Sequence, residues 1–225
     1  MPEQVLFRWP TNAAFGRAVP KSKIYEHGKV RTALRERFID EVQRITWAYK
    51  LADVTIHLGG TPAVPEIQVF VVEAKGEDVS DDVLATIDRS VNFPIIFEVA
   101  NSESVRTAAT QKSLIGRPMI GAYFTTDWQP ADATRRPLPT AIDLPGLYEE
   151  LLAALAQVER RAGETMSEAT VRLDRARKLQ RDIAALEKKL RAEPQLNRKI
   201  EIRRQIIARN PSLEDLTEPI PNNKE

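Results

Sequence analysis

Three residues could form the centre of a metal-dependent reaction: Asp53, Glu73 and Lys75. Asp53 opens one predicted strand, and Glu73-Ala-Lys75 follows the apolar run 67–72 of the next. One carboxylate from each of two adjacent strands could hold Mg²⁺, which prefers oxygen ligands. Lys75 could then orient or deprotonate an attacking water. The pattern indicates either a catalytic site, with Asp53 and Glu73 as metal ligands, or simply a solvated strand end with an ion pair.

The composition gives little support to other reaction chemistry. The chain has 225 residues, no Cys and two His, which excludes thiol nucleophiles, disulfides and thiolate metal sites. Gly59-Gly60 lacks the Lys and the helix of a phosphate-binding loop. We therefore expect no cofactor, except Mg²⁺ if Asp53 and Glu73 form a catalytic metal site. The absence of a long apolar run and the charged start MPEQVLFRWP predict a cytoplasmic protein that makes no membrane contact.

Basic residues are unevenly distributed, although the net charge is only +1. Residues 17–50 carry 9 basic and 4 acidic side chains, and residues 51–150 carry 7 and 15. Residues 172–209 carry 13 basic and 5 acidic side chains. Such clusters either bind phosphates or are ordinary solvated helix faces. The candidate nucleic-acid contacts are Lys21, Lys23, Arg31, Arg35, Arg181, Lys188 and Lys189.

The hydrophobic spacing predicts an α/β core domain over residues 1–160, in which helices pack on a small mixed β-sheet. Apolar residues at intervals of three and four predict a helix over 29–50, after an irregular lead-in over 1–28. Helices are also expected at 80–91 and 144–158. Strands are expected at 53–58, 67–72, 94–100, 105–110 and 120–126.

The C-terminal part of the chain predicts a helical hairpin over 166–209. Leu179, Ile183, Leu186 and Leu190 recur at the intervals of a coiled-coil-like seam. Pro194 interrupts this pattern, so the two helices are predicted at 166–192 and 196–209. We expect the seam to bind a protein partner. The polar tail 210–225 is expected to be mobile.

Several segments agree in order and spacing with a known family. They are KIYEH at 23–27, ERFIDEVQRITWAYKL at 36–51, EIQVF at 66–70, EAK at 73–75, PIIF at 94–97 and EPQLNRKIE at 193–201. On these segments the chain resembles the bacterial family of domain of unknown function DUF4391. The resemblance implies no activity. It implies genomic neighbours, because members are similar to proteins encoded beside helicases and DNA methyltransferases of restriction-modification or phage-defence type.

The residues Asp53, Glu73 and Lys75 also resemble the acid-acid-x-Lys core of restriction-type nucleases. The predicted order of helix, strand, strand, helix and strand is one strand short of that core.

These observations lead to one preferred function and two alternatives. The preferred function is an accessory, non-catalytic subunit of a DNA-processing restriction or phage-defence assembly, which docks on a helicase or DNA methyltransferase and helps to hold nucleic acid. The first alternative is the Mg²⁺-dependent nuclease. The second is a stand-alone nucleic-acid-binding module.

Overall fold

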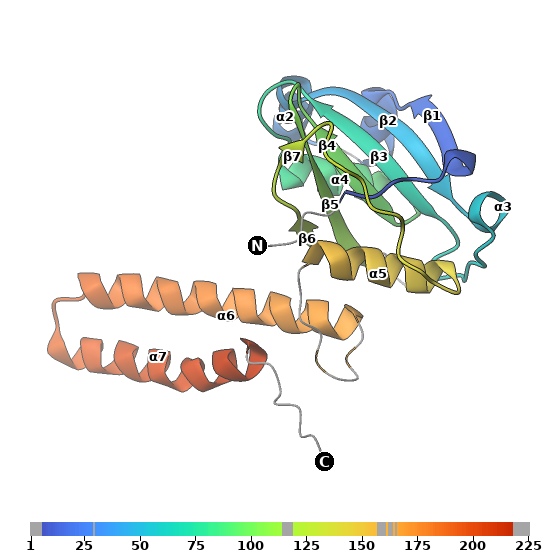
Figure 1. Cartoon of the computed structure of the whole chain (residues 1–225). Helices are drawn as coiled ribbons and strands as arrows, with labels where there is room; N and C mark the ends of the chain where they lie inside the picture. The colour runs from blue at the N-terminus through green and yellow to red at the C-terminus, as the bar shows by residue number, and fades with distance from the viewer. Residues whose placement is uncertain are drawn as a thin grey trace, which may run out of the picture. The chain divides into compact units, whose positions relative to one another are not determined.

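The computed structural model describes residues 6–28, 30–113, 119–156, 161, 164 and 166–217. The chain divides into two compact units, Met1–Gln157 and Val158–Glu225. The first unit is a mixed α/β structure and the second contains two long helices (Figure 1). The α/β class and the mixed sheet predicted from the sequence are therefore confirmed.

The first unit is built on a seven-stranded sheet. The strand order is β1-β2-β3-β4-β5-β6, and a short β7 pairs with β5. Only β3 and β4 are parallel, joined by the crossover helix α4, while the other neighbours are antiparallel. The strands are β1 (Ala14–Ala18), β2 (Val42–Leu51), β3 (Ile67–Ala74), β4 (Ile95–Ala100), β5 (Ser104–Ser113), β6 (Met119–Thr125) and β7 (Gln129–Pro130). The remaining elements of this unit are η1 (Thr11–Ala13), α1 (Lys21–Gly28), α2 (Thr32–Glu41), α3 (Asp53–Ile56), α4 (Asp81–Ser90) and α5 (Leu144–Ala156).

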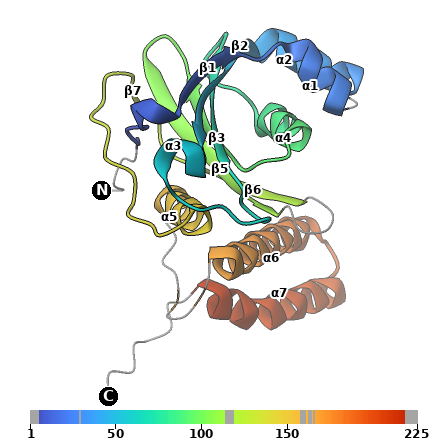
Figure 2. The same cartoon turned by 90° about the vertical axis from the view of Figure 1, so that its right-hand side faces the viewer.

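The main hydrophobic core lies between the sheet and the helices α1, α2 and α4, which lie on one side of it (Figure 2). Phe70 and Phe97 occupy paired positions on the parallel strands β3 and β4 and face this core. Ile24 comes from α1, Phe38 from α2 and Ile87 from α4, and all three are buried there. Burying this apolar surface is the main favourable contribution to folding, and it fixes the two helices α2 and α4 on the sheet.

The predicted helix over 29–50 is only half correct. The helix α2 ends at Glu41, and the residues from Val42 to Leu51 form the strand β2. This segment is rich in β-branched and aromatic residues, which favour strands. Bulges between Val42 and Arg44 and between Trp47 and Tyr49 shift the strand register. A bulge adds one residue, so side chains three apart can face the same side, which imitates helical spacing.

The predicted strand 53–58 is wrong, because the chain forms the single helical turn α3 there. The Ala52 backbone N–H donates to the Thr55 hydroxyl at 2.9 Å, and that hydroxyl donates to the Lys50 carbonyl at 2.8 Å. His57 ends the turn in the left-handed conformation, with φ of 56°. These local hydrogen bonds favour a turn over an extended strand.

The lead-in was also predicted incorrectly, because it contains the edge strand β1 and the helix α1. The other predicted strands and helices of this unit are present, with shifted ends. Residues 157–158 of the predicted helix 144–158 lie outside the described residues.

The second unit is a helical hairpin of α6 (Met166–Ala192) and α7 (Leu196–Thr217). Ile183 and Ile202 are buried, at 8% and 6% exposure. The helix α7 continues through Pro211, past residue 209, where the sequence predicted the tail to begin. Arg172 supports this extension, since its guanidinium donates to the Leu216 carbonyl at 2.8 Å. Residues 218–225 of the predicted tail lie outside the described residues.

Candidate nucleic-acid interface

The structure does not bring Asp53 and Glu73 together. Leu51 pairs with Ile67 at the start of β3, and Arg44 pairs with Glu73 at its other end. Asp53 follows Leu51 by two residues, so it lies near the start of β3. The six residue steps from Ile67 to Glu73 span about 20 Å at the usual rise of a strand. Two ligands of one Mg²⁺ ion must each lie about 2 Å from it, so these two carboxylates do not form a shared site.

Glu73 and Lys75 have structural partners instead. The Glu73 carboxylate accepts hydrogen bonds from the Arg44 guanidinium at 2.5 and 2.8 Å. The Lys75 ammonium donates to the Ile39 carbonyl at 2.5 Å, near the C-terminal end of α2. Among the described residues, no three His, Asp or Glu side chains are grouped as they would be around a metal ion.

The predicted nucleic-acid contacts of the first unit have different environments. The Lys21 ammonium donates to the carbonyls of Phe38 and Val42, and so caps the end of α2. Burial, and then the nearby charge of Lys75, lower the pKa of Lys21. Lys23 forms an exposed ion pair with Glu26.

Arg35 lies 4.7 Å from the centre of the Tyr25 ring, a cation–π contact. Arg31 is the predicted contact that lines a surface hollow.

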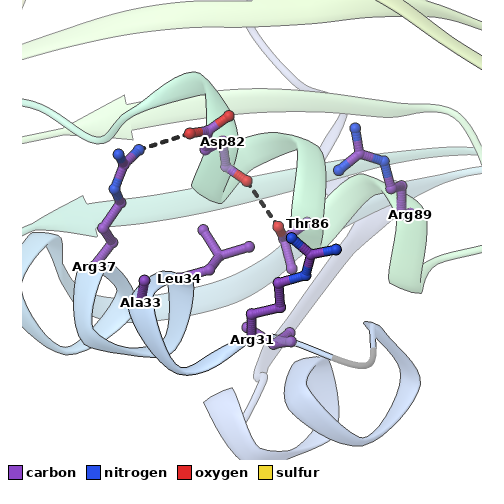
Figure 3. Close-up of a pocket in the computed structure, with 8 residues that line it drawn as sticks. Arg31, Ala33, Leu34, Arg37, Asp82, Thr86 and Arg89 are labelled. Atoms are coloured by element: carbon purple, nitrogen blue, oxygen red, sulfur yellow. Dashed lines mark hydrogen bonds and ion pairs between the residues drawn. The ribbon is translucent and has the colours of Figure 1, made fainter.

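This hollow lies between α2 and α4 and has a volume of about 400 Å³ (Figure 3). The lining residues of each helix recur at intervals of three and four, so they share one face of that helix, and the two faces are turned toward each other. Arg37 extends toward α4 from α2, and Arg31 extends toward α4 from the position just before α2 (Figure 3). The lining residues are Val30, Arg31, Ala33, Leu34 and Arg37 from α2 and the turn before it, and Asp82, Thr86 and Arg89 from α4.

The hollow is positively charged, with three arginines and one aspartate. Arg37 is paired with Asp82, with 2.6 Å between the guanidinium nitrogen and the carboxylate oxygen. Arg31 and Arg89 are exposed, and neither guanidinium forms a hydrogen bond or ion pair within the described part of the chain. An exposed guanidinium that forms no ion pair is well suited to bind phosphate, because its planar fork matches two phosphate oxygens.

A buried polar network holds α4, and with it Arg89, in place. The Lys112 ammonium, from β5, forms an ion pair with the Asp88 carboxylate at 2.8 Å. It also donates to the carbonyls of Asp88, Val91 and Phe93, at the end of α4. The Tyr123 hydroxyl donates to the other Asp88 oxygen at 2.9 Å. The network therefore ties the C-terminal end of α4 to the strands β5 and β6.

The electrostatics of this network follow from its burial. Burial raises the pKa of Asp88, and the Lys112 charge and the hydrogen bonds from Lys112 and Tyr123 partly offset this rise. Burial, followed by the charge of Asp88, raises the pKa of the Tyr123 hydroxyl. The Tyr148 hydroxyl donates to the Thr110 carbonyl, and burial raises its pKa as well. Both phenols therefore remain protonated donors at neutral pH.

The sequence of this chain matches one known family. The chain matches the family described as Domain of unknown function (DUF4391) over residues 7–209. The chain belongs to this family. No curated protein and no solved structure matches it. The DUF4391 match begins before β1 and ends within α7, so it includes both the hollow and most of the hairpin.

The helical hairpin carries the remaining candidate nucleic-acid contacts and the predicted seam. Arg181, Lys188 and Lys189 are exposed on α6. Of the predicted seam, Ile183 is buried, while Leu179, Leu186 and Leu190 are half-buried. No helix in the described ranges is both long enough and apolar enough to cross a membrane.

Sequence reasoning missed Arg37 and Arg89 as lining residues of the hollow. Arg37 lies six residues after Arg31, so the basic character of α2 could have indicated it. Arg89 lies at the other end of a different helix, in an acidic part of the sequence. Only the packing of α2 on α4 brings these residues to one hollow.

Proposed function

We propose that this chain is an accessory, non-catalytic subunit of a DNA-processing restriction or phage-defence assembly. It holds DNA at the hollow between α2 and α4 and docks on a helicase or DNA methyltransferase through its hairpin. The observation that carries the proposal is the pair of exposed arginines, Arg31 and Arg89, whose guanidinium groups form no hydrogen bond or ion pair within the described residues. The identity of the partner rests on the genomic neighbours that the family resemblance implies.

Electrostatics support the DNA-binding part of this proposal. Arg37 is neutralised by Asp82, so the positive charge left in the hollow belongs to Arg31 and Arg89. Phosphate contacts made by such side chains supply most sequence-independent affinity for DNA. Exposed ion pairs contribute little to stability, and unpaired arginines contribute less, so a binding role explains their placement better than a structural one.

Exposed apolar side chains support the docking part. Val171, Ile200 and Ile207 of the hairpin are 48%, 45% and 61% exposed. A two-helix hairpin buries only one stripe of each helix, so part of its apolar surface stays in contact with water. A protein partner that covers these side chains would remove their apolar surface from water, which favours association. The hairpin therefore has the surface that a protein partner would cover.

Charge reversal tests the DNA-binding part. The double variant R31E/R89E is expected to weaken DNA binding and to reduce the slope of log affinity against log salt by about 1.8, which is about 0.9 for each lost phosphate contact. The control R8E/R17E removes two exposed arginines outside the hollow and changes the net charge equally. An equal effect of both variants would show that only the overall charge matters and that the hollow is not the site.

Truncation tests the docking part. A chain lacking residues 166–225 is expected to keep its tryptophan fluorescence but to lose co-purification with its helicase or methyltransferase partner from the native host. The triple variant R181E/K188E/K189E keeps the hairpin seam and is expected to keep the partner, while its weaker DNA binding would show that these side chains touch phosphate. If the truncated chain still co-purifies with the partner, docking lies elsewhere. If the full chain has no partner but binds DNA, the stand-alone module is correct.

A further inference from the structure

The floor of the hollow between α2 and α4 is apolar, which phosphate binding alone does not require. Val30, Ala33 and Leu34 line the hollow together with the arginines. Leu34 also packs against the main core, so its position in the hollow is fixed. A site for the backbone of a duplex needs charged groups on an open surface. A concave site with an apolar floor matches a ligand that is flat, partly apolar and anionic.

The charges divide the hollow into two ends. Arg37 and Asp82 form an ion pair at 2.6 Å on one side, and this side has no net charge. The Thr86 hydroxyl donates to the Asp82 carbonyl at 2.7 Å, which holds that side of α4 in a fixed arrangement. Arg31 and Arg89 supply the free positive charge. A phosphate group is therefore expected at Arg31 and Arg89, with the rest of the ligand extending over Ala33 and Leu34.

We infer that the hollow takes one unpaired nucleotide of a single-stranded nucleic acid, with its base on the apolar floor and its phosphate on Arg31 and Arg89. This inference rests on the proposed DNA-binding function and names the form of nucleic acid that the same site selects. A volume of about 400 Å³ lies in the usual range of small-ligand sites. Bases in a duplex are stacked and paired, so they do not enter such a hollow, whereas an unpaired base can lie against an arginine plane and pack on apolar side chains.

The experiment fills the hollow without changing its charge. Ala33 is an exposed residue of α2, and A33W places an indole on the floor. The control A208W puts the same side chain on an exposed position of α7. Fluorescence anisotropy would measure binding of a labelled 12-nucleotide single strand and of the blunt duplex with the same sequence. A33W is expected to weaken single-strand binding about tenfold, a loss of about 1.4 kcal/mol, because the indole occupies the space of the base, and to leave duplex binding unchanged.

A second measurement uses the unmodified protein and does not depend on the folding of A33W. Deoxyadenosine monophosphate is expected to displace the single strand at a concentration at least about tenfold lower than inorganic phosphate does, because only the nucleotide also covers the floor. Equal displacement by the two would overturn the inference.

The variants separate failure of this inference from failure of the proposed function. If R31E/R89E weakens binding while A33W has no effect, the hollow is a phosphate site without a base, and only the inference is wrong. Equal weakening of single strand and duplex by A33W also overturns the inference. If the protein binds neither nucleic acid, the proposed DNA-binding function fails, and the inference fails with it.

Discussion

Lys112 is the side chain whose loss should most destabilise the first unit. Its ammonium and the Asp88 carboxylate are almost completely buried, at 2% and 1% side-chain exposure. Replacing Lys112 by Met keeps much of the volume but removes the charge. The variant leaves a buried carboxylate without a counter-charge, and three carbonyls at the end of α4 lose a donor.

The expected cost of K112M is about 3–5 kcal/mol in the free energy of unfolding, as found when one partner of a buried ion pair is removed. This is a large part of the usual stability of a domain, about 5–15 kcal/mol. The double variant D88N/K112M should be more stable than K112M, because it no longer buries an uncompensated charge. The surface control K23M breaks an exposed pair with side-chain exposures of 63% and 60%. It should cost no more than about 1 kcal/mol.

Urea denaturation followed by tryptophan fluorescence measures this cost directly. The three tryptophans, Trp9, Trp47 and Trp128, all lie in the first unit, so the signal reports the unfolding of that unit alone. A loss for K112M as small as that for K23M would refute the reasoning, since it would mean that Lys112 is not buried against Asp88 in solution. A double variant less stable than K112M would refute the argument about the uncompensated charge.

Three further predictions concern other parts of the chain. Burial raises the pKa of Asp88 above its unfolded value, so the folded state keeps this proton to higher pH than the unfolded state. The free energy of unfolding should therefore fall as pH rises from about 4 to the folded pKa. In urea denaturation at a series of pH values, D88N should flatten this part of the pH dependence. E73Q weakens an ion pair in which the side chains of Arg44 and Glu73 are 63% and 34% exposed. It should lower the free energy of unfolding by no more than about 1 kcal/mol and leave DNA binding unchanged. Loss of a Mg²⁺-dependent cleavage activity at unchanged melting temperature would instead restore the nuclease interpretation. I183D places a carboxylate in the buried seam of the hairpin, so the helical circular dichroism of the hairpin should melt at lower temperature while the tryptophan transition stays in place.

The central part of the sheet could be predicted because its signal is local. Residues 67–72 and 95–100 are nearly continuous apolar runs, typical of strands buried on both faces, and they form the parallel pair β3 and β4. Ser80, Asp81 and Asp82 indicate the start of α4, which the structure confirms. The segment 42–51 misled the prediction because the bulges of β2 imitate helical spacing, and bulges depend on the neighbouring strands.

In the candidate sites, too, the residue types could be predicted from the sequence, but their neighbours in space could not. Asp53 and Glu73 were paired on the assumption that 53–58 is a strand, and the helical turn α3 removes that assumption. The basic character of residues 17–50 was visible in the sequence, but not which residues are neutralised. The Lys21 ammonium donates to carbonyls at the end of α2, and Lys23 forms an ion pair with Glu26. Arg31 instead lines the hollow, and its guanidinium forms no hydrogen bond or ion pair in the described part of the chain.

The sequence by itself determined the fold class, the helical hairpin and the family, because hydrophobic periodicity and ordered sequence segments are properties of the chain alone. The tertiary structure decided that Arg31, just before α2, and Arg89 of α4 share one hollow with an apolar floor. It also decided that Asp88 and Lys112, 24 residues apart, form a buried pair that fixes α4. Such pairings depend on which helix face packs against which neighbour, and that choice is made by the burial of the whole core rather than by any local segment.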